Sequence, residues 1–499
     1  MRIPLLLAAL LVAGCLGGTT KDSASPSPQP QQPLATAGST TVLGAHQEPL
    51  PASAFAGELP RFEQRMVAGR PAGEPTLAIS RDGTLLYPAI AFDTPGQTLP
   101  RTKLFATKDN GATWTDVTPC VTEVTVPAPA PAGGSLCAGR VSPYSFDPMV
   151  YGDRDTGRLF NLDLQAAGGS WISWSDDGGA TWQAVPVGGG NPQESHDHQT
   201  LFGGPGVGEA RPTGYPNVLY YCVNTGGVSC GRSLDGGTTW GNVGSPAIGS
   251  CRGGLHGHGV VARSGTAYLP QSSYCDHPLL HISRDGGTTW TESTVNGTLG
   301  GDDINETDPS VAVDESGNVY YFWLDEKALP RLAVSRDGGT TFGPAWNVTV
   351  PGLRTANYPT IVAGDQGRVA FLYYATTYHS PKDPGKDAPG FAKDYRDANP
   401  DWNAYVGLSL NADGDAPVFA TTLANDPADP LAKGACLFRC YGVYDFLDID
   451  IEPRTGQVYV ALVDVCTGAC AQPGGKPPTA YPAGLGAIGV QVAGARLRG

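Results

Sequence analysis

Seven segments spread along the chain each open a run of β-forming residues with a side chain that could do chemistry. The opening residues are Glu74, Asp147, Asp197, His256, Asp308, Tyr358 and Asp445. Two of them have histidine neighbours, in His196-Asp-His198 and His256-Gly-His258. Gathered carboxylates raise each other's pKa or recruit a cation. Oxygen ligands suit Ca²⁺, and added imidazoles suit a transition metal. The candidate metal ligands are therefore His196, Asp197, His198, His256, His258 and Asp308.

The same positions allow a second interpretation. An Asp or Glu at the start of a strand, often before Pro, can cap local N–H groups without binding anything. The histidine pairs are the more specific signal, because alternation in an extended strand places both histidines of a pair on one face. The candidates for catalysis are Glu74, Asp147, Asp308 and Tyr358, with Arg354 nearby in the sequence.

A short pattern that occurs five times predicts the elements that position these residues. Its template is S/T-x-D-x-G-x-T-W/F, and the copies span residues 107–114, 175–182, 233–240, 283–290 and 335–342. Asp and Gly are turn residues, and the Thr and aromatic that follow favour a strand. Each copy is therefore predicted to be a tight hairpin turn. Five identical active sites in one chain would be unusual, so we interpret the central carboxylates as structural: Asp109, Asp177, Asp235, Asp285 and Asp337.

This pattern resembles the Asp-box, or BNR, repeat of sialidase-like β-propellers. The resemblance implies an all-β ring of four-stranded blades, in which each repeat joins the two outer strands of a blade. It also implies that the repeats lie on one face and that the residues opening the inner strands meet at the channel mouth on the other. The seven strand starts favour seven blades, with six as the alternative. Residues 411–415 form a degenerate sixth turn, and an N-terminal strand near 62–67 is expected to close the ring.

The resemblance is weaker for catalysis than for architecture. Sialidases bind a sugar carboxylate with three arginines and use a Tyr nucleophile paired with Glu, with an Asp as acid/base. Arg70-Pro71 is the nearest match to the family's first arginine motif and lacks its Ile, while Arg140, Arg252 and Arg354 only lie in suitable connections. Three functions therefore stay open: a propeller that binds a glycan, peptide or cation; a sialidase-like glycoside hydrolase or a lyase; and a metal-dependent enzyme that uses the His/Asp ring.

The N-terminus predicts export. Arg2, an apolar run and small residues before Cys15 are typical of a signal segment, and Leu11-Val-Ala-Gly-Cys15 resembles a lipobox in which Cys15 carries the lipid. Residues 1–15 are thus a predicted lipoprotein-type signal peptide, 16–55 a disordered tether rich in Ser, Pro and Gln, and 60–499 the propeller. We expect a monomer anchored to the outer side of the cell membrane, with plain secretion as the alternative.

The net charge limits the kinds of binding partner that we expect, and the cysteine content indicates the cellular compartment. The formal net charge of −15 argues against nucleic-acid binding and fits cations, neutral glycans or basic partners. If Cys15 of the eleven cysteines is lipidated, an even number remains, which predicts disulfides in an exported chain. The expected pairs are Cys120–Cys137, Cys222–Cys230, Cys251–Cys275, Cys436–Cys440 and Cys466–Cys470, with a metal site at the last four as the alternative.

Overall fold

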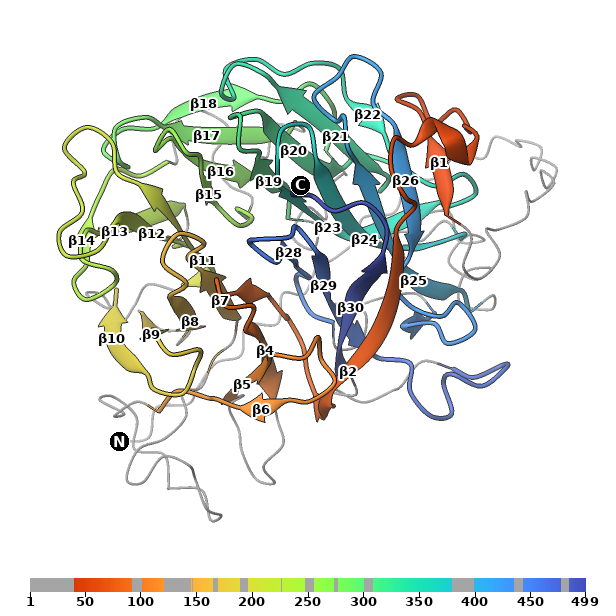
Figure 1. The fold of residues 1–499 in the computed structure, drawn as a ribbon, viewed down its shortest axis with the longest axis horizontal. Helices are drawn as coiled ribbons and strands as arrows, with labels where there is room; N and C mark the ends of the chain where they lie inside the picture. The colour runs from red at the N-terminus through yellow and green to blue at the C-terminus, as the bar shows by residue number, and fades with distance from the viewer. Residues whose placement is uncertain are drawn as a thin grey trace, which may run out of the picture.

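The computed structural model is a ring of seven antiparallel blades, a seven-bladed β-propeller (Figure 1). The seven-blade prediction is confirmed. Within the part of the chain that the structure describes, the helix is a single 3-10 turn, η1 (Ala52–Ala54), and none is long and apolar enough to span a membrane. The described residues are 40–91, 101–120, 145, 147–164, 169–188, 196–225, 227–246, 255–272, 277–299, 308–378, 399–434, 443–476 and 484–499.

The first five blades each consist of four consecutive strands, ordered from the channel outward. Blade one holds β3 (Ala78–Ile79), β4 (Leu85–Ala91), β5 (Arg101–Thr107) and β6 (Thr115–Asp116), and blade two β7 (Pro148–Gly152), β8 (Leu159–Leu164), β9 (Ser170–Ser175) and β10 (Gln183–Val187). Blade three holds β11 (Asp197–Pro205), β12 (Asn217–Asn224), β13 (Val228–Ser233) and β14 (Gly241–Asn242). Blade four holds β15 (Val260–Val261), β16 (Ala267–Gln271), β17 (Leu279–Ser283) and β18 (Thr291–Thr294), and blade five β19 (Ser310–Val313), β20 (Val319–Leu324), β21 (Pro330–Ser335) and β22 (Trp346–Asn347).

The last two blades recruit strands from the N-terminal part of the chain. Blade six holds β23 (Thr355–Ala363), β24 (Val369–Thr376), β25 (Asp401–Ser409) and β26 (Phe419–Leu423), with β27 (Ala432–Lys433) beside β25. Blade seven holds β28 (Ile449–Ile451), β29 (Val458–Asp464), β30 (Leu485–Ala493) and, outermost, β2 (Arg61–Pro71). The predicted N-terminal closing strand is therefore confirmed.

A further strand, β1 (Thr41–Leu43), corrects the predicted extent of the tether. It pairs antiparallel with β26 and adds to the outer edge of blade six, from Thr41 opposite Thr421 to Leu43 opposite Phe419. Residues 41–55, which were assigned to a disordered tether, are therefore structured. Val42 and Leu43 explain the difference, because both side chains are buried at this edge.

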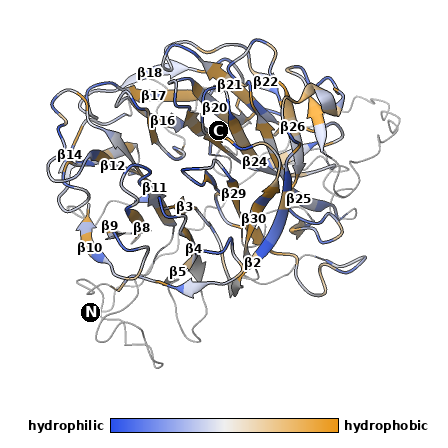
Figure 2. Ribbon diagram, in the orientation of Figure 1, coloured by the Kyte–Doolittle hydropathy of each residue, from blue (hydrophilic) through white to orange (hydrophobic). Residues whose placement is uncertain are grey.

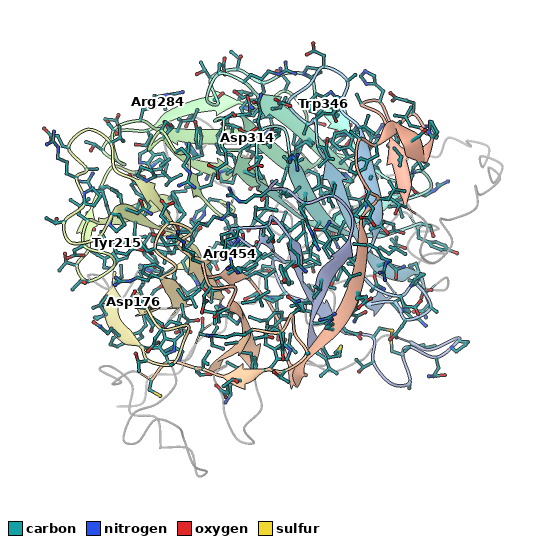
Figure 3. The ribbon with its side chains drawn as sticks, in the orientation of Figure 1. Asp176, Tyr215, Arg284, Asp314, Trp346 and Arg454 are labelled. Carbon is teal, nitrogen blue, oxygen red and sulfur yellow. A yellow bond between two sulfur atoms is a disulfide. The ribbon has the colours of Figure 1, made fainter. Side chains whose placement is uncertain are left out.

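Burial explains why the middle strands of a blade are almost wholly apolar. Every side chain of β20 and of β29 is buried, because neighbouring blades cover both faces of such a strand. The short outer strands β6 and β14 are exposed. Figure 2 shows hydrophobic colours along the strands and hydrophilic colours on the connections and along β2. In Figure 3 side chains fill the ring, with Trp346 toward the rim and Arg454 near the centre.

The five repeats form the predicted hairpins between the third and fourth strands of blades one to five. In the first, the Thr113 amide donates to Oδ1 of Asp109 at 2.8 Å and its hydroxyl to Oδ2 at 2.6 Å. The turn ends on Gly111, whose φ of 83° favours glycine. The hydrogen bonds from Thr113 hold the pKa of Asp109 down at about 2. Equivalent bonds to Thr recur at Asp177, Asp235, Asp285 and Asp337.

Two of the predicted disulfides are confirmed. Cys222 and Cys230 face each other across β12 and β13, and Cys466–Cys470 closes a short loop after β29. Cys120 is also disulfide-bonded. The remaining predicted partners lie outside the described residues: Cys137, Cys251, Cys275, Cys436 and Cys440.

Candidate functional site

The inner strands of all seven blades line a central channel. A cavity of about 210 Å³ lies within it, bounded by stretches such as Met149–Asp155 of blade two and Ser310–Glu315 of blade five. Several residues that open these strands meet at one end of the channel, which we call the channel mouth: Glu74, Asp147, Asp308, Tyr358 and Asp445. The sequence pattern predicted this convergence, because a propeller brings equivalent positions of successive blades around one axis.

Three buried carboxylates form the centre of the channel mouth. Glu74, Asp147 and Asp445 come from blades one, two and seven, and each offers an oxygen within 4.8 Å of the other two. All three are at most 5 % exposed. Of the residues that the structure describes, these are the ones whose spacing could hold a metal ion.

The carboxylates perturb one another strongly. Burial raises the pKa of Asp147 to about 6, helped by the charges of Asp197 and Asp445 and opposed by His198 and by a hydrogen bond with Glu74. A pair of hydrogen-bonded carboxyls must share a proton, because two bare carboxylates repel each other. The cluster therefore carries negative charge, which either a proton or a cation can compensate.

His198 connects this cluster to blade five. Its Nδ1 lies 2.7 Å from Oδ2 of Asp308, and its Nε2 lies 3.5 Å from Oδ2 of Asp445. Its backbone N–H donates to Oδ2 of Asp147 at 3.3 Å. Burial lowers the pKa of His198, but these carboxylates outweigh it and raise that pKa well above the ordinary value. His198 is therefore a buried imidazolium among carboxylates.

The backbone at His198 departs from the predicted extended strand. His198 has a φ of 48°, and the register of β11 against β12 shifts between Asp197 and Thr200. This bulge breaks the alternation that would have placed both histidines of the pair on one face. The ring of His196 lies instead near Gly188, and Asp197 is exposed.

The second histidine pair lies in blade four and stays neutral. Nδ1 of His256 lies 3.0 Å from the carbonyl oxygen of Gly257, and burial lowers the pKa of His256 to about 3. His258 lines the cavity and packs edge-on against Phe446, with ring centroids 5.3 Å apart. Phe446 also contacts His198, with ring centroids 6.3 Å apart, so it packs against both histidines.

The sialidase-type residues do not assemble within the described structure. Tyr358 is buried at the mouth and contacts Tyr374 edge-on, but Arg354 is exposed. Arg140 and Arg252 lie outside the described residues. A small cavity of about 20 Å³ beside Asp308, Tyr358 and Asp445 has room for one water-sized species rather than a sugar ring.

The structure adds residues to the channel that the sequence did not single out. Gln199 donates from its side-chain amide to the backbone oxygen of Asp147. Asp448 accepts from the backbone N–H of Leu77 at 2.8 Å, and burial raises its pKa to about 7. The alternation of Asp448 and Asp450 along β28 is the one sequence signal that places such side chains in the channel.

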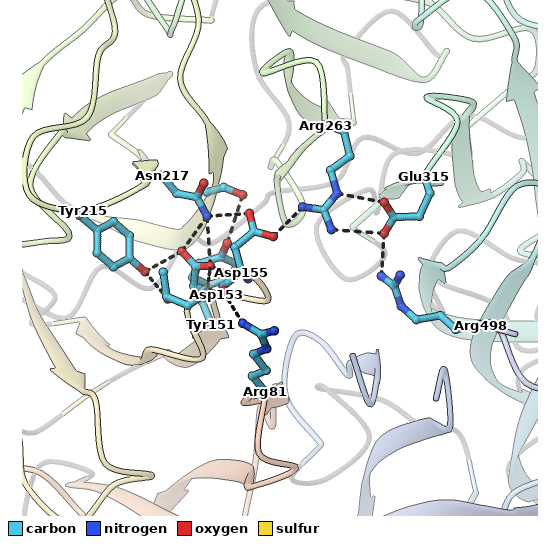
Figure 4. A network of polar contacts seen from close by, with 11 residues as sticks. Arg81, Tyr151, Asp153, Asp155, Tyr215, Asn217, Arg263, Glu315 and Arg498 are labelled. Carbon is cyan, nitrogen blue, oxygen red and sulfur yellow. Dashed lines mark hydrogen bonds and ion pairs between the residues drawn. The ribbon is translucent and has the colours of Figure 1, made fainter. Parts of the chain in front are cut away.

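Charged residues from the first turn of several blades cross the opposite end of the channel (Figure 4). Arg263 contacts Asp155 at 2.6 Å and Glu315 at 2.9 Å, and Arg498 contacts Glu315 at 2.7 Å. The side chains of Asn217 and Tyr215 donate hydrogen bonds to the carboxylate of the neighbouring Asp153. Asp155 and Glu315 thus have arginine partners, and Asp153 accepts from an amide and a hydroxyl, so the carboxylates of this network are paired, unlike those of the channel mouth.

Comparisons with known proteins describe similarity of shape. No family model matches the chain, and no curated protein matches it. A Dyadobacter fermentans protein of unknown function is similar over 87 % of this chain and 99 % of its own, at 14 % identity and a TM-score of 0.38. The Aleuria aurantia lectin in complex with Fucα1-6GlcNAc is similar over 70 % and 95 %, at 8 % identity and a TM-score of 0.41. The NanB sialidase of Streptococcus pneumoniae is similar over 85 % and 69 %, at 13 % identity and a TM-score of 0.39. At these values they carry no argument about function.

Proposed function

We propose that this chain is a binding propeller that holds a divalent cation, Ca²⁺ in preference to others, at the channel mouth. The observation that carries the proposal is the approach of Glu74, Asp147 and Asp445 to within 4.8 Å of one another from three blades. Ca²⁺ binds oxygen ligands at about 2.3–2.6 Å, so two ligands of one ion lie up to about 5 Å apart.

Two further buried acceptors lie on residues next to this cluster, because Asp308 lines the same small cavity as Asp445 and Gln199 is hydrogen-bonded to the backbone of Asp147. Oδ1 of Asp308 and Oε1 of Gln199 are buried, and neither has a hydrogen-bond partner among the described residues. Buried oxygens without donors are costly unless a cation or a water satisfies them. The neutral histidines of blade four are less suited to Ca²⁺, which prefers oxygen.

Calorimetric titration of the calcium-depleted full chain with CaCl₂ tests this function. We expect saturable binding near neutral pH that is about tenfold or more weaker in Asp147→Asn, because one ligand charge is lost. Asp415→Asn is the matched control, because the side chain of Asp415, in the degenerate turn of residues 411–415, is 97 % exposed. Absence of binding in the unaltered chain, or equal binding in Asp147→Asn, would remove the proposal.

A glycoside hydrolase is the second candidate, and one observation favours it. The hydrogen-bonded pair of Glu74 and Asp147, with the pKa of Asp147 raised to about 6, is a carboxyl able to donate a proton near neutral pH. A fluorogenic sialoside, assayed with and without Asp147→Asn, separates the two functions. Turnover that Asp147→Asn abolishes would favour the enzyme over the binding protein.

We further propose that the chain is exported and held at the outer surface of the membrane by a lipid on Cys15, so that the long connections of the mouth face can take a glycan or a peptide. The sequence around Cys15 supports this, and it lies outside the described residues. Partition of the full chain into a detergent phase, lost in Cys15→Ala, is the expected result. Equal partition of both forms would contradict lipidation.

A further inference from the structure

The ring closes through strand pairing between the two ends of the propeller. In blade seven, β2 from the N-terminal side pairs with β30 from the C-terminal side, from Arg61 opposite Ala493 to Pro71 opposite Leu485. Register shifts interrupt this ladder next to Arg61 and after Met66. We call the β2–β30 ladder, together with the contacts between blades seven and one, the seam.

Glu74 lies directly on the seam. It follows the end of β2 by three residues, in the short connection from the outer strand of blade seven to β3 of blade one. Its backbone N–H donates to the carbonyl oxygen of Val443 at 3.0 Å, on the segment that leads into β28. Asp445 lies on that same segment, so both sides of the seam supply a carboxylate to the channel mouth.

The carboxylates make the seam sensitive to charge. Without a bound cation, the carboxyl groups of Glu74 and Asp445 crowd together on opposite sides of the closure, and the cationic ring of His198, 3.5 Å from Asp445, compensates only part of their negative charge. With a cation between them and Asp147, the same groups attract and tie blades one, two and seven together.

We infer that the cation at Glu74, Asp147 and Asp445 acts as a clasp on the ring, so that Ca²⁺ controls how readily the seam opens. This inference rests on the proposed function. Across the described residues, no second cluster with this spacing joins any other pair of blades. The effect of Ca²⁺ should therefore be local to the seam rather than shared by all blades.

Hydrogen exchange measured by mass spectrometry on the full chain, with CaCl₂ or with a chelator, tests the clasp. We expect Ca²⁺ to slow exchange of the backbone amides in β2 and β30 by about tenfold or more. Amides exchange when the structure opens locally, so the exchange rate reports local stability. Exchange in β16 and β17 of blade four, across the ring, should change much less. Asp147→Asn should abolish the difference between the two conditions, and Asp415→Asn should keep it. If Asp147→Asn does not fold, Glu74→Gln provides the same comparison.

The outcomes separate the clasp from the binding site. If calorimetry shows Ca²⁺ binding but protection is spread evenly over the blades or falls away from the seam, the clasp is wrong and the binding function stands. If calorimetry shows no binding, both fall. Protection confined to the seam and dependent on Asp147 supports both.

Discussion

Four residues at the channel mouth have a backbone conformation that side chains usually avoid. Glu74, His198, Tyr358 and Tyr444 have φ values of 50°, 48°, 57° and 70°. Such positions cost about 1–2 kcal/mol each and persist where the surrounding structure imposes them. Three of the four are opening or histidine-pair positions that sequence reasoning had selected for their chemistry. Strain and buried charge therefore coincide at this end of the channel.

His281, a second buried histidine of blade four, gives a prediction about acid stability. Nε2 of His281 donates to Oε1 of Gln271 at 2.5 Å, and burial lowers the pKa of His281 to about 4. A lowered pKa contributes stability that is complete above the unfolded value of about 6.5 and is lost as the pH falls through about 4. The loss is on the order of 3 kcal/mol at full titration.

We therefore expect His281→Gln, which cannot charge, to lose less thermal stability than the unaltered chain between about pH 7 and pH 4. Melting temperatures measured at both values check this. Equal falls in the two proteins would show that His281 does not resist protonation. His46, for which the structure shows an exposed surface position, gives the control His46→Gln, which should behave as the unaltered chain.

At the scale of elements, the repeat hairpins are self-sufficient turns. Each central Asp is saturated by its own Ser or Thr and the following Thr, and none takes part in the contacts of the channel mouth. The local turn chemistry could be predicted from the sequence because each side-chain donor and its acceptor are at most four residues apart. The bulge in β11 was not readable, because the partners that His198 meets there, Asp308 and Asp445, are far away in the sequence.

Substitution of a repeat carboxylate should therefore affect stability but not the proposed site. Asp235→Ala removes the acceptor for the amide and the hydroxyl of Thr239, at 2.9 and 2.6 Å. We expect a loss of about 1–2 kcal/mol of folding stability, read as a lower guanidinium midpoint, with Ca²⁺ binding unchanged. Asp415→Ala, in the degenerate turn, should stay within about 0.5 kcal/mol. Weakened Ca²⁺ binding in Asp235→Ala would contradict the separation of the two faces.

At the scale of the whole molecule, closure depends on residues far from the C-terminal blade that they complete. β2 belongs to blade seven although blade one follows it in the chain. The count of strands predicted this, because blade seven lacked an outer strand and an open ring would expose sheet edges. The extra strand β1 was missed, since three residues carry too little pattern to identify.

Deletion of residues 1–71, which include the closing strand β2, should destabilise the protein far more than deletion of residues 1–39. A chain that begins at residue 72 lacks β1 and β2 and leaves β30 as an open edge, so we expect loss of cooperative unfolding and self-association. A chain that begins at residue 40 keeps both strands and should melt as the full chain does. Circular dichroism melts and sedimentation velocity check both. A cooperative monomer beginning at residue 72 would show that the ring does not need β2.

The sequence by itself determined the repeat hairpins, the seven blades, the closing strand and two of the disulfides. These features follow from turn residues, strand patterns and spacing, all of which act over short stretches of chain. Only the tertiary structure decided which charges meet. Glu74 and Asp445 are brought together because the ring closes between them, whereas His196 is separated from His198 by one bulge. The distance between side chains of different blades depends on how seven inner strands converge on one axis, and a local sequence pattern cannot predict that distance.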